Sequence, residues 1–193
     1  MGLRERKKQQ THAALVEAAA RLFAEKGYDK TTVADIAAAA DVSTRTFFAY
    51  FRAKEDVLFA GTDQRLRAIA EAADAVRADS PLEAVRRIVE HVLATSDDLS
   101  SPDRLAIMLA KPELQAQALQ RLIAAQRLIA GWLRRVYPDR VDDAQSRAVA
   151  GAVVGALVGA VLGGIERGDS PDGLRERARR ALALLEDGLH TFG

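Results

Sequence analysis

The sequence predicts an all-α protein with about nine helices, and two observations support this prediction. Apolar residues recur at the three- and four-residue spacings of helices, and no apolar run alternates with period two between turns as a strand would. Ser80-Pro81 and Ser101-Pro102 each place a capping serine before a proline, which is favoured at the first helical position. The chain is therefore expected to be helical almost throughout.

The first two helices are expected before residue 41. An apolar face predicts a first helix that ends at Gly27, a residue suited to a left-handed helix cap. Thr31 or Thr32 can cap a second, short helix that runs through Ala40.

A third short helix follows a tight turn of sequence ADVS. Ser43 can cap it, and it ends near Tyr50 or Phe51. A fourth helix is expected from about Lys54 and a fifth from Pro81. A sixth is expected from Pro102 to Lys111, and a seventh from there to about Val136. An eighth is expected near 143–167 and a ninth from Pro171 to about Leu189.

The third helix carries four of the ten aromatic residues of the chain at positions 47–51. On a helical wheel Phe47 points away from an arc formed by Thr44, Arg45, Phe48 and Ala49. A helix of two turns needs tertiary packing to persist, so Phe47 is expected in a core and the arc at the surface. Two short helices joined by a tight turn have the layout of a helix-turn-helix, whose second helix fits the DNA major groove.

Composition limits the classes of function. The chain has 193 residues, 49% hydrophobic and 28% charged, which predicts a folded soluble protein. It has no cysteine, which excludes disulfides, thiol nucleophiles and cysteine metal sites and fits a cytoplasmic protein. Residues 1–54 carry a net charge of +4 within a chain of net charge +1. This uneven distribution is expected of an amino-terminal region that binds a polyanion, and equally of a basic surface that contacts only solvent.

Residues 23–58, FAEKGYDKTTVADIAAAADVSTRTFFAYFRAKEDVL, resemble the DNA-binding region of the tetracycline-repressor (TetR-type) family of bacterial transcriptional regulators. The resemblance lies in the Gly27-Tyr28 helix end, the Thr31-Thr32 cap, the TFFAYF helix and the Lys-Glu pair after it. It implies residues 1–53 as a DNA-binding domain and 54–193 as a ligand-sensing and dimerisation domain. Simple packing of a short aromatic helix is the alternative, and it leaves the caps and the expected surface cations unexplained.

The resemblance also implies roles for individual residues. Thr31 or Thr32 would contact a phosphate, Tyr50 and Lys54 would clamp phosphates, and the groove-facing set would be Thr44, Arg45, Thr46, Phe48 and Ala49. Arg45 is the best candidate for reading a guanine, because a guanidinium can bind guanine O6 and N7 together.

Two positions depart from the family pattern. Phe48 stands where tyrosine is usual, which loses a hydroxyl contact and favours contact with a thymine methyl group. Asp41 stands where glycine is usual in the turn, and aspartate tolerates the left-handed conformation at a cost of about 1–2 kcal/mol.

Residues 148–165, AVAGAVVGALVGAVLGGI, form eighteen consecutive apolar residues. This length can span a membrane, but five glycines and the absence of interfacial aromatics favour close packing between backbones. A homodimer through residues near 143–189 is expected, and the resemblance implies the same interface. The two DNA-binding domains of the dimer would then read a near-palindromic operator on double-stranded DNA. No membrane association is expected.

The middle of the chain is expected to sense a small-molecule effector, as the resemblance implies, and to repress transcription until that effector binds. Met108 and Trp132 are candidate lining residues, although both suit an ordinary core. No nucleophile–base set, phosphate-binding loop or metal-spaced cluster is found, so no enzyme, cofactor or metal is expected. The effector and the other residues of its pocket are not indicated by the sequence.

Overall fold

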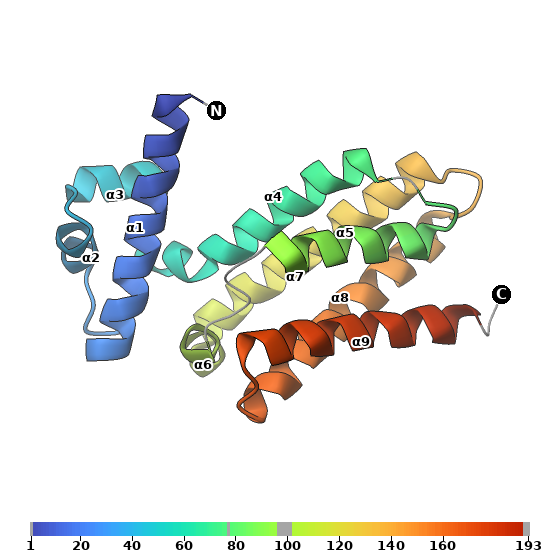
Figure 1. Ribbon diagram of the computed structural model, residues 1–193. Coiled ribbons are helices and arrows are strands. Elements are labelled where there is room, and N and C mark those ends of the chain that lie inside the picture. Colours follow the sequence, from blue (N-terminus) through green and yellow to red (C-terminus); the bar gives the residue numbers. More distant parts are fainter. Residues whose placement is uncertain (1, 77, 96–101, 191–193) are drawn as a thin grey trace. The chain divides into compact units, whose positions relative to one another are not determined.

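A computed structural model of the chain describes residues 2–76, 78–95 and 102–190. Within these ranges the regular structure is helical and contains no strand, which confirms the predicted fold class (Figure 1). The elements are α1 (Leu3–Lys26), α2 (Val33–Ala39), α3 (Thr44–Tyr50), a 3-10 helix η1 (Lys54–Phe59), α4 (Ala60–Ala75), α5 (Pro81–Thr95), α6 (Pro102–Ala110), α7 (Pro112–Val136), α8 (Asp143–Glu166) and α9 (Pro171–His190).

The chain divides into two compact units. The first consists of Met1–Ala60 and Ser101–Gln115, and the second of Gly61–Ser100 and Ala116–Gly193. The first unit thus combines the predicted DNA-binding head with α6 and the first turn of α7. The predicted domain boundary at residues 53 and 54 is a functional division and stays a prediction.

Local hydrogen bonds fix the start of α2. The Thr32 hydroxyl accepts from the Asp35 amide at 3.1 Å, and the Asp35 carboxylate accepts from the Thr32 amide at 2.8 Å. This reciprocal pair is a capping box. Lys26, in the last turn of α1, forms an ion pair of 2.8 Å with the same carboxylate. The hydrogen bonds from Lys26 and then Thr32 hold the pKa of Asp35 well below its usual value.

The turn between α2 and α3 is a Schellman motif. The Asp41 amide donates to Ala38 O at 3.1 Å, and the Val42 amide donates to Ala37 O at 2.9 Å. Asp41 has φ of 53°, so aspartate occupies the left-handed position as expected. Ser43 then caps α3 by accepting from the Thr46 amide at 3.0 Å.

The fourth helix starts differently from the prediction. An α-helix was expected from about Lys54, whereas Lys54–Phe59 form the 3-10 helix η1 and α4 begins at Ala60. The Asp56 carboxylate accepts from the Arg52 amide at 3.0 Å, and the Asp56 amide donates to Ala53 O at 3.2 Å. These bonds favour a tighter first turn.

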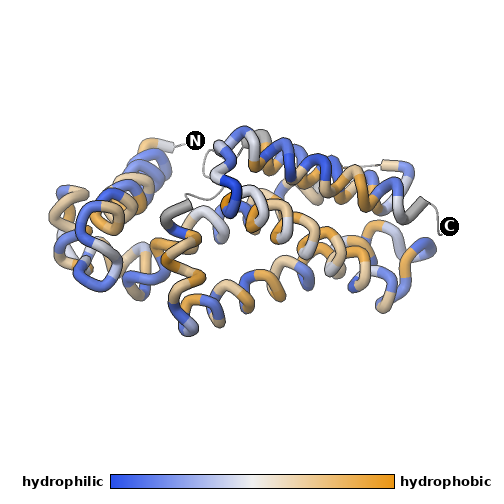
Figure 2. The backbone as a smooth tube through the Cα atoms, turned by 90° about the horizontal axis from the view of Figure 1, so that it is seen from below, coloured by the Kyte–Doolittle hydropathy of each residue, from blue (hydrophilic) through white to orange (hydrophobic). Residues whose placement is uncertain are grey.

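The later helix ends agree with the prediction. Ser80 caps α5 by accepting from the Glu83 amide at 3.1 Å, and Lys111-Pro112 separates α6 from α7. Ser101, the cap expected for α6, lies outside the described residues. Most helices carry both hydrophobic and hydrophilic residues along their length, as amphipathic helices do (Figure 2).

The helices α8 and α9 form the most extensively contacting pair of helices in the second unit. Gly164 is buried in α8, and a Cβ there would collide with Leu174 Cδ2 of α9. Among the described residues, α8 is the one helix long and apolar enough to cross a membrane, and only 28% of its most apolar window is buried. Most of the other residues of this window are half-buried, so α8 is only partly covered within the chain.

Candidate nucleic-acid interface and ligand cavity

The recognition face of α3 follows from the burial of one phenylalanine. Phe47 is fully buried, and its ring centre lies 5.5 Å from that of Phe51, which is also buried. The opposite side of the helix is open, and the Phe48 side chain is 56% exposed. The predicted arc is therefore an exposed face, because Thr44, Arg45 and Ala49 are exposed beside Phe48.

Three other predicted contact residues are half-buried. Thr46 shares a hydrogen bond of 2.9 Å with the Ser43 hydroxyl, which links it to the cap of α3. The Tyr50 ring centre lies 6.3 Å from that of His12, so α1 supports it. Lys54, at the start of η1, is the third.

The two predicted threonines differ in exposure. Thr31 is 1% exposed, and its hydroxyl donates to Gly27 O at 2.8 Å and to Leu22 O at 3.3 Å. The Thr31 side chain is therefore part of the interior, and we remove it from the set of contact candidates. Thr32 is exposed at the amino terminus of α2, where helix amides attract anions.

The Lys54 ammonium lies on backbone carbonyls of its own unit. It donates to Tyr28 O at 2.7 Å and to Thr31 O at 2.9 Å, and it stands 4.1 Å from the centre of the Tyr28 ring. Burial lowers the pKa of Lys54 below its usual value. The predicted phosphate contact therefore has at most one N–H group left, because an ammonium has three.

A second lysine reaches the same tyrosine from a distant part of the sequence. Lys111 Nζ lies 2.8 Å from an Asp29 carboxylate oxygen and 5.6 Å from the centre of the Tyr28 ring. Burial, with the nearby carboxylates of Glu55, Asp29 and Glu113, raises the pKa of Tyr28 to about 12. Sequence analysis missed this cluster, because no local pattern relates residue 111 to residue 28.

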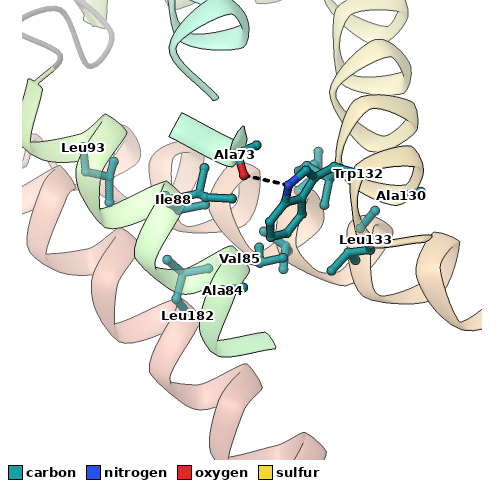
Figure 3. Packing of buried hydrophobic residues seen from close by; sticks show 14 of the residues in the cluster. Ala73, Ala84, Val85, Ile88, Leu93, Ala130, Trp132, Leu133 and Leu182 are labelled. Carbon is teal, nitrogen blue, oxygen red and sulfur yellow. Dashed lines mark hydrogen bonds between the residues drawn. The ribbon is translucent and has the colours of Figure 1, made fainter. Parts of the chain in front are cut away.

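The second unit contains a cavity of about 340 Å³ between residues of α4, α5 and α7. Apolar side chains form most of its lining, among them Ile69, Val85, Ile88, Val89, Leu128 and Trp132. The Trp132 indole lies among the side chains of the core, and its N–H donates to Ala73 O at 2.8 Å (Figure 3). Trp132 is thus both core and lining, whereas Met108 belongs to the first unit.

No cluster of three or more histidine, aspartate or glutamate residues that could hold a metal occurs in the described part of the chain. The site therefore consists of an exposed helix face with one arginine, in one unit, and an apolar cavity in the other. This combination defines a helix-turn-helix regulator with a separate region suited to a ligand.

Sequence comparison places the chain in a family. Residues 15–60 match the family of "Bacterial regulatory proteins, tetR family", and residues 79–190 match the "MftR C-terminal domain". The chain belongs to the TetR family of bacterial transcriptional regulators, which bind DNA through a helix-turn-helix.

Two curated relatives are regulators. The chain is 32% identical over 146 residues to the HTH-type transcriptional regulator TcmR of Streptomyces glaucescens, over 65% of this chain and 64% of that protein. It is 47% identical over 45 residues to the HTH-type transcriptional regulator HbdR of Aromatoleum sp., over 23% of this chain and 20% of that protein. The matched part thus falls short of two thirds of either relative.

Solved structures share the fold. The FadR of Thermus thermophilus, a TetR-family transcriptional repressor in complex with lauroyl-CoA, has a TM-score of 0.60 at 24% identity, over 92% of this chain and 94% of that one. A SmeT–triclosan complex has a TM-score of 0.64 at 20% identity, over 90% and 88% of the two chains.

Proposed function

We propose that this protein is a homodimeric transcriptional repressor that leaves a near-palindromic operator when a small-molecule effector binds. The exposed face of α3, with Arg45 beside Phe48, carries this proposal. It offers one planar cation for a guanine and one apolar ring for a thymine methyl group. We place its site of action in the bacterial cytoplasm.

The remaining contacts would position the protein on the DNA backbone. Thr32 and the amides at the start of α2 suit a phosphate, and Tyr50 and the remaining N–H group of Lys54 suit another. The proposed interface comprises Thr32, Thr44, Arg45, Thr46, Phe48, Ala49, Tyr50 and Lys54. Residues 1–53 would bind DNA, and residues 54–193 would sense the effector and dimerise.

The uncovered glycines of α8 support a dimer. A Cβ added at Gly151, Gly155, Gly159 or Gly163 would meet no atom within 4 Å in the chain. Glycine destabilises a helix interior by about 0.8–1 kcal/mol relative to alanine, so four such residues need a reason that lies outside the chain. Close approach of a second copy supplies it, and two copies would place two heads on two half-sites.

A lipid partner for α8 is the alternative, and α9 argues against it. α9 contacts α8 extensively and carries ion pairs from Glu176 to Arg179 and Arg180, at 3.7 and 3.1 Å. Arg177 also pairs with Asp169 at 2.6 Å. Inserting α8 into hydrocarbon would bring these charges with it, which is costly. Recovery of the protein in the membrane fraction, and its release by detergent alone, would favour the lipid.

Helix α7 supports a link between effector and DNA. Its first turn lies in the compact unit of the head, where Lys111 just before it pairs with Asp29. Further along, the same helix supplies Leu128 and Trp132 to the cavity. A ligand that shifts α7 can therefore bias the equilibrium between two states of the head.

Selection of genomic fragments by the purified protein tests the proposal. We expect a near-palindrome that binds at least a thousandfold more tightly than scrambled DNA at the same salt concentration. Sequence-independent, salt-sensitive binding alone would refute base reading by α3.

A further inference from the structure

Two arginines are the only charged residues among those that line the cavity of the second unit. Arg127 and Arg135 are exposed and lie two turns apart on α7, and the rest of the lining is apolar apart from the Trp132 indole and backbone groups. Long arginine side chains place their methylenes on an apolar wall and their guanidinium groups at its edge. The cavity thus has an apolar interior and a positively charged rim.

Gly131 lies midway between the two arginines and also lines the cavity. It is exposed, and a Cβ there would meet no atom within 4 Å. Glycine weakens the middle of a helix, and packing within the chain does not demand it at this position. Its effect is to leave no side chain between Arg127 and Arg135 on this face of α7.

At Arg127 the cationic rim has a guanidinium group without a counter-ion among the described residues. Arg127 has neither a carboxylate partner nor a hydrogen bond among the residues that the structure describes, unlike the neighbouring Arg134, which pairs with Asp143 at 2.6 Å. No aspartate or glutamate lines the cavity. A ligand that brings one negative charge would complete the site, since a guanidinium binds a carboxylate through two parallel hydrogen bonds.

We propose that the effector is an amphipathic carboxylate whose apolar body fills the cavity and whose carboxylate binds Arg127 and Arg135 beside Gly131. A water molecule takes about 30 Å³ in the liquid, so 340 Å³ holds a body of roughly ten to fifteen non-hydrogen atoms. Medium-chain fatty acids and alkylbenzoates both have this chemistry. The inference rests on the proposed function only in calling this ligand the effector.

The chain supplies its own probe of occupancy. Trp132 is its single tryptophan and lines the cavity, so intrinsic fluorescence reports binding without a label. Decanoate and 4-butylbenzoate would be titrated below their micelle-forming concentrations, with decanamide as a neutral ligand of nearly identical shape. Calorimetry would provide a second measurement of each dissociation constant.

We expect both carboxylates to bind, and decanamide to bind at least tenfold more weakly than decanoate. Preference for one carboxylate over the other identifies the body as aliphatic or aromatic and supports the class in either case. Equal affinity for decanoate and decanamide, or no binding of either carboxylate, would overturn the inference.

Variants of α7 test the rim. Arg127→Gln and Arg135→Gln should each weaken decanoate severalfold and leave decanamide unchanged, whereas Arg134→Gln, the matched control outside the cavity, should change neither. Gly131→Leu should weaken both ligands, while Gly131→Ala should retain them in a protein at least as stable as the natural one. A decanoate-to-decanamide ratio that both rim variants leave unchanged would also overturn the inference.

Operator binding, measured in parallel, separates this inference from the proposed function. If decanoate binds with the expected preference but leaves operator affinity unchanged, the carboxylate site is upheld and its role as the effector site is refuted. If a neutral or cationic compound releases the operator while no carboxylate binds, the proposed function is upheld and the carboxylate inference is refuted.

Discussion

The Lys54 ammonium nitrogen lies 4.1 Å from the centre of the Tyr28 ring and donates to the carbonyl oxygen of the same residue at 2.7 Å. Its second acceptor is Thr31 O, so the Lys54 side chain holds the connection between α1 and α2 in place. The buried Thr31 hydroxyl stabilises the same connection by donating to Gly27 O. The loop between α1 and α2 is therefore held by side-chain bonds to the backbone carbonyls of Gly27, Tyr28 and Thr31.

Replacement of Lys54 tests this structural role against the phosphate contact expected from the sequence. Lys54→Met keeps the apolar stem and removes two hydrogen bonds from a charged donor, so we expect the free energy of unfolding to fall by about 1–2 kcal/mol. Urea denaturation followed by circular dichroism measures it, with Lys30→Met as an exposed control. If Lys54 also binds a phosphate, the salt slope of operator affinity drops by about 0.9; an unchanged slope removes that contact.

Titration of Tyr28 gives a prediction in alkaline solution. Its pKa is raised to about 12 from an ordinary value of 10.0, so the folded protein keeps a proton that the unfolded chain loses. The stabilisation is complete below pH 10 and is lost as the pH rises through about 12, so stability declines across this interval. Absorbance of ionised tyrosine would be compared with that of Tyr28→Phe, and the signal that the variant lacks should have its midpoint near pH 12. A midpoint near 10 for the missing signal would contradict the prediction.

Arg45 is expected to read a base. Arg45→Ala should reduce discrimination between the best operator and its single-base variants by about 1–3 kcal/mol at one position of each half-site. Competition binding against an operator series measures this change. Arg21→Ala removes an exposed arginine of α1 and serves as the control. Equal loss of affinity for all sequences would instead make Arg45 a phosphate contact.

Substitution of two glycines of α8 tests the proposed dimer. At Gly155 we expect loss of the dimer with the subunit fold kept, and at Gly164 a less stable subunit. Gly155 is exposed, so Gly155→Leu should preserve the fold of the subunit but convert the dimer to monomers in light scattering. Gly164 is buried against Leu174, so Gly164→Ala should lower the free energy of unfolding by about 1–3 kcal/mol through overpacking. A dimer that tolerates leucine at position 155 would place the interface elsewhere.

Features that depend on neighbours in sequence could be predicted. The caps at Thr32 and Ser43 follow from residues three positions apart, and Phe47 as a core anchor follows from the helical period. The left-handed Asp41 follows from its place between two helices. The sequence likewise indicated the breaks at Pro112 and the apolar character of α8.

Features that depend on distant residues could not be predicted. Lys54 and Lys111 meet Tyr28 across 26 and 83 residues, and a surface lysine has the same local pattern whether it reaches a carbonyl or solvent. The 3-10 start of the fourth helix depends on a bond between Arg52 and Asp56 that competes with the α-helical pattern. Arg127 and Arg135 have the spacing of a solvent-exposed helix face, and only the packed helices show a cavity behind them.

Trp132 links the cavity to the end of α4, and its replacement tests that link. Trp132→Phe keeps an aromatic ring in the core but removes the donor to Ala73 O, leaving a buried carbonyl without its partner. We expect the free energy of unfolding to fall by about 1–3 kcal/mol from this lost bond, with a further loss from the smaller ring. Because the variant lacks the fluorophore, urea denaturation followed by circular dichroism is the appropriate measurement.

Tyr137→Phe is the comparison variant, because it removes a half-buried hydroxyl that donates to Ala78 O at 2.9 Å. Its free energy of unfolding should fall less than that of Trp132→Phe, since water can replace the hydroxyl as donor. If the two variants lost equal stability, burial of the indole N–H would not be what makes the Trp132 bond important.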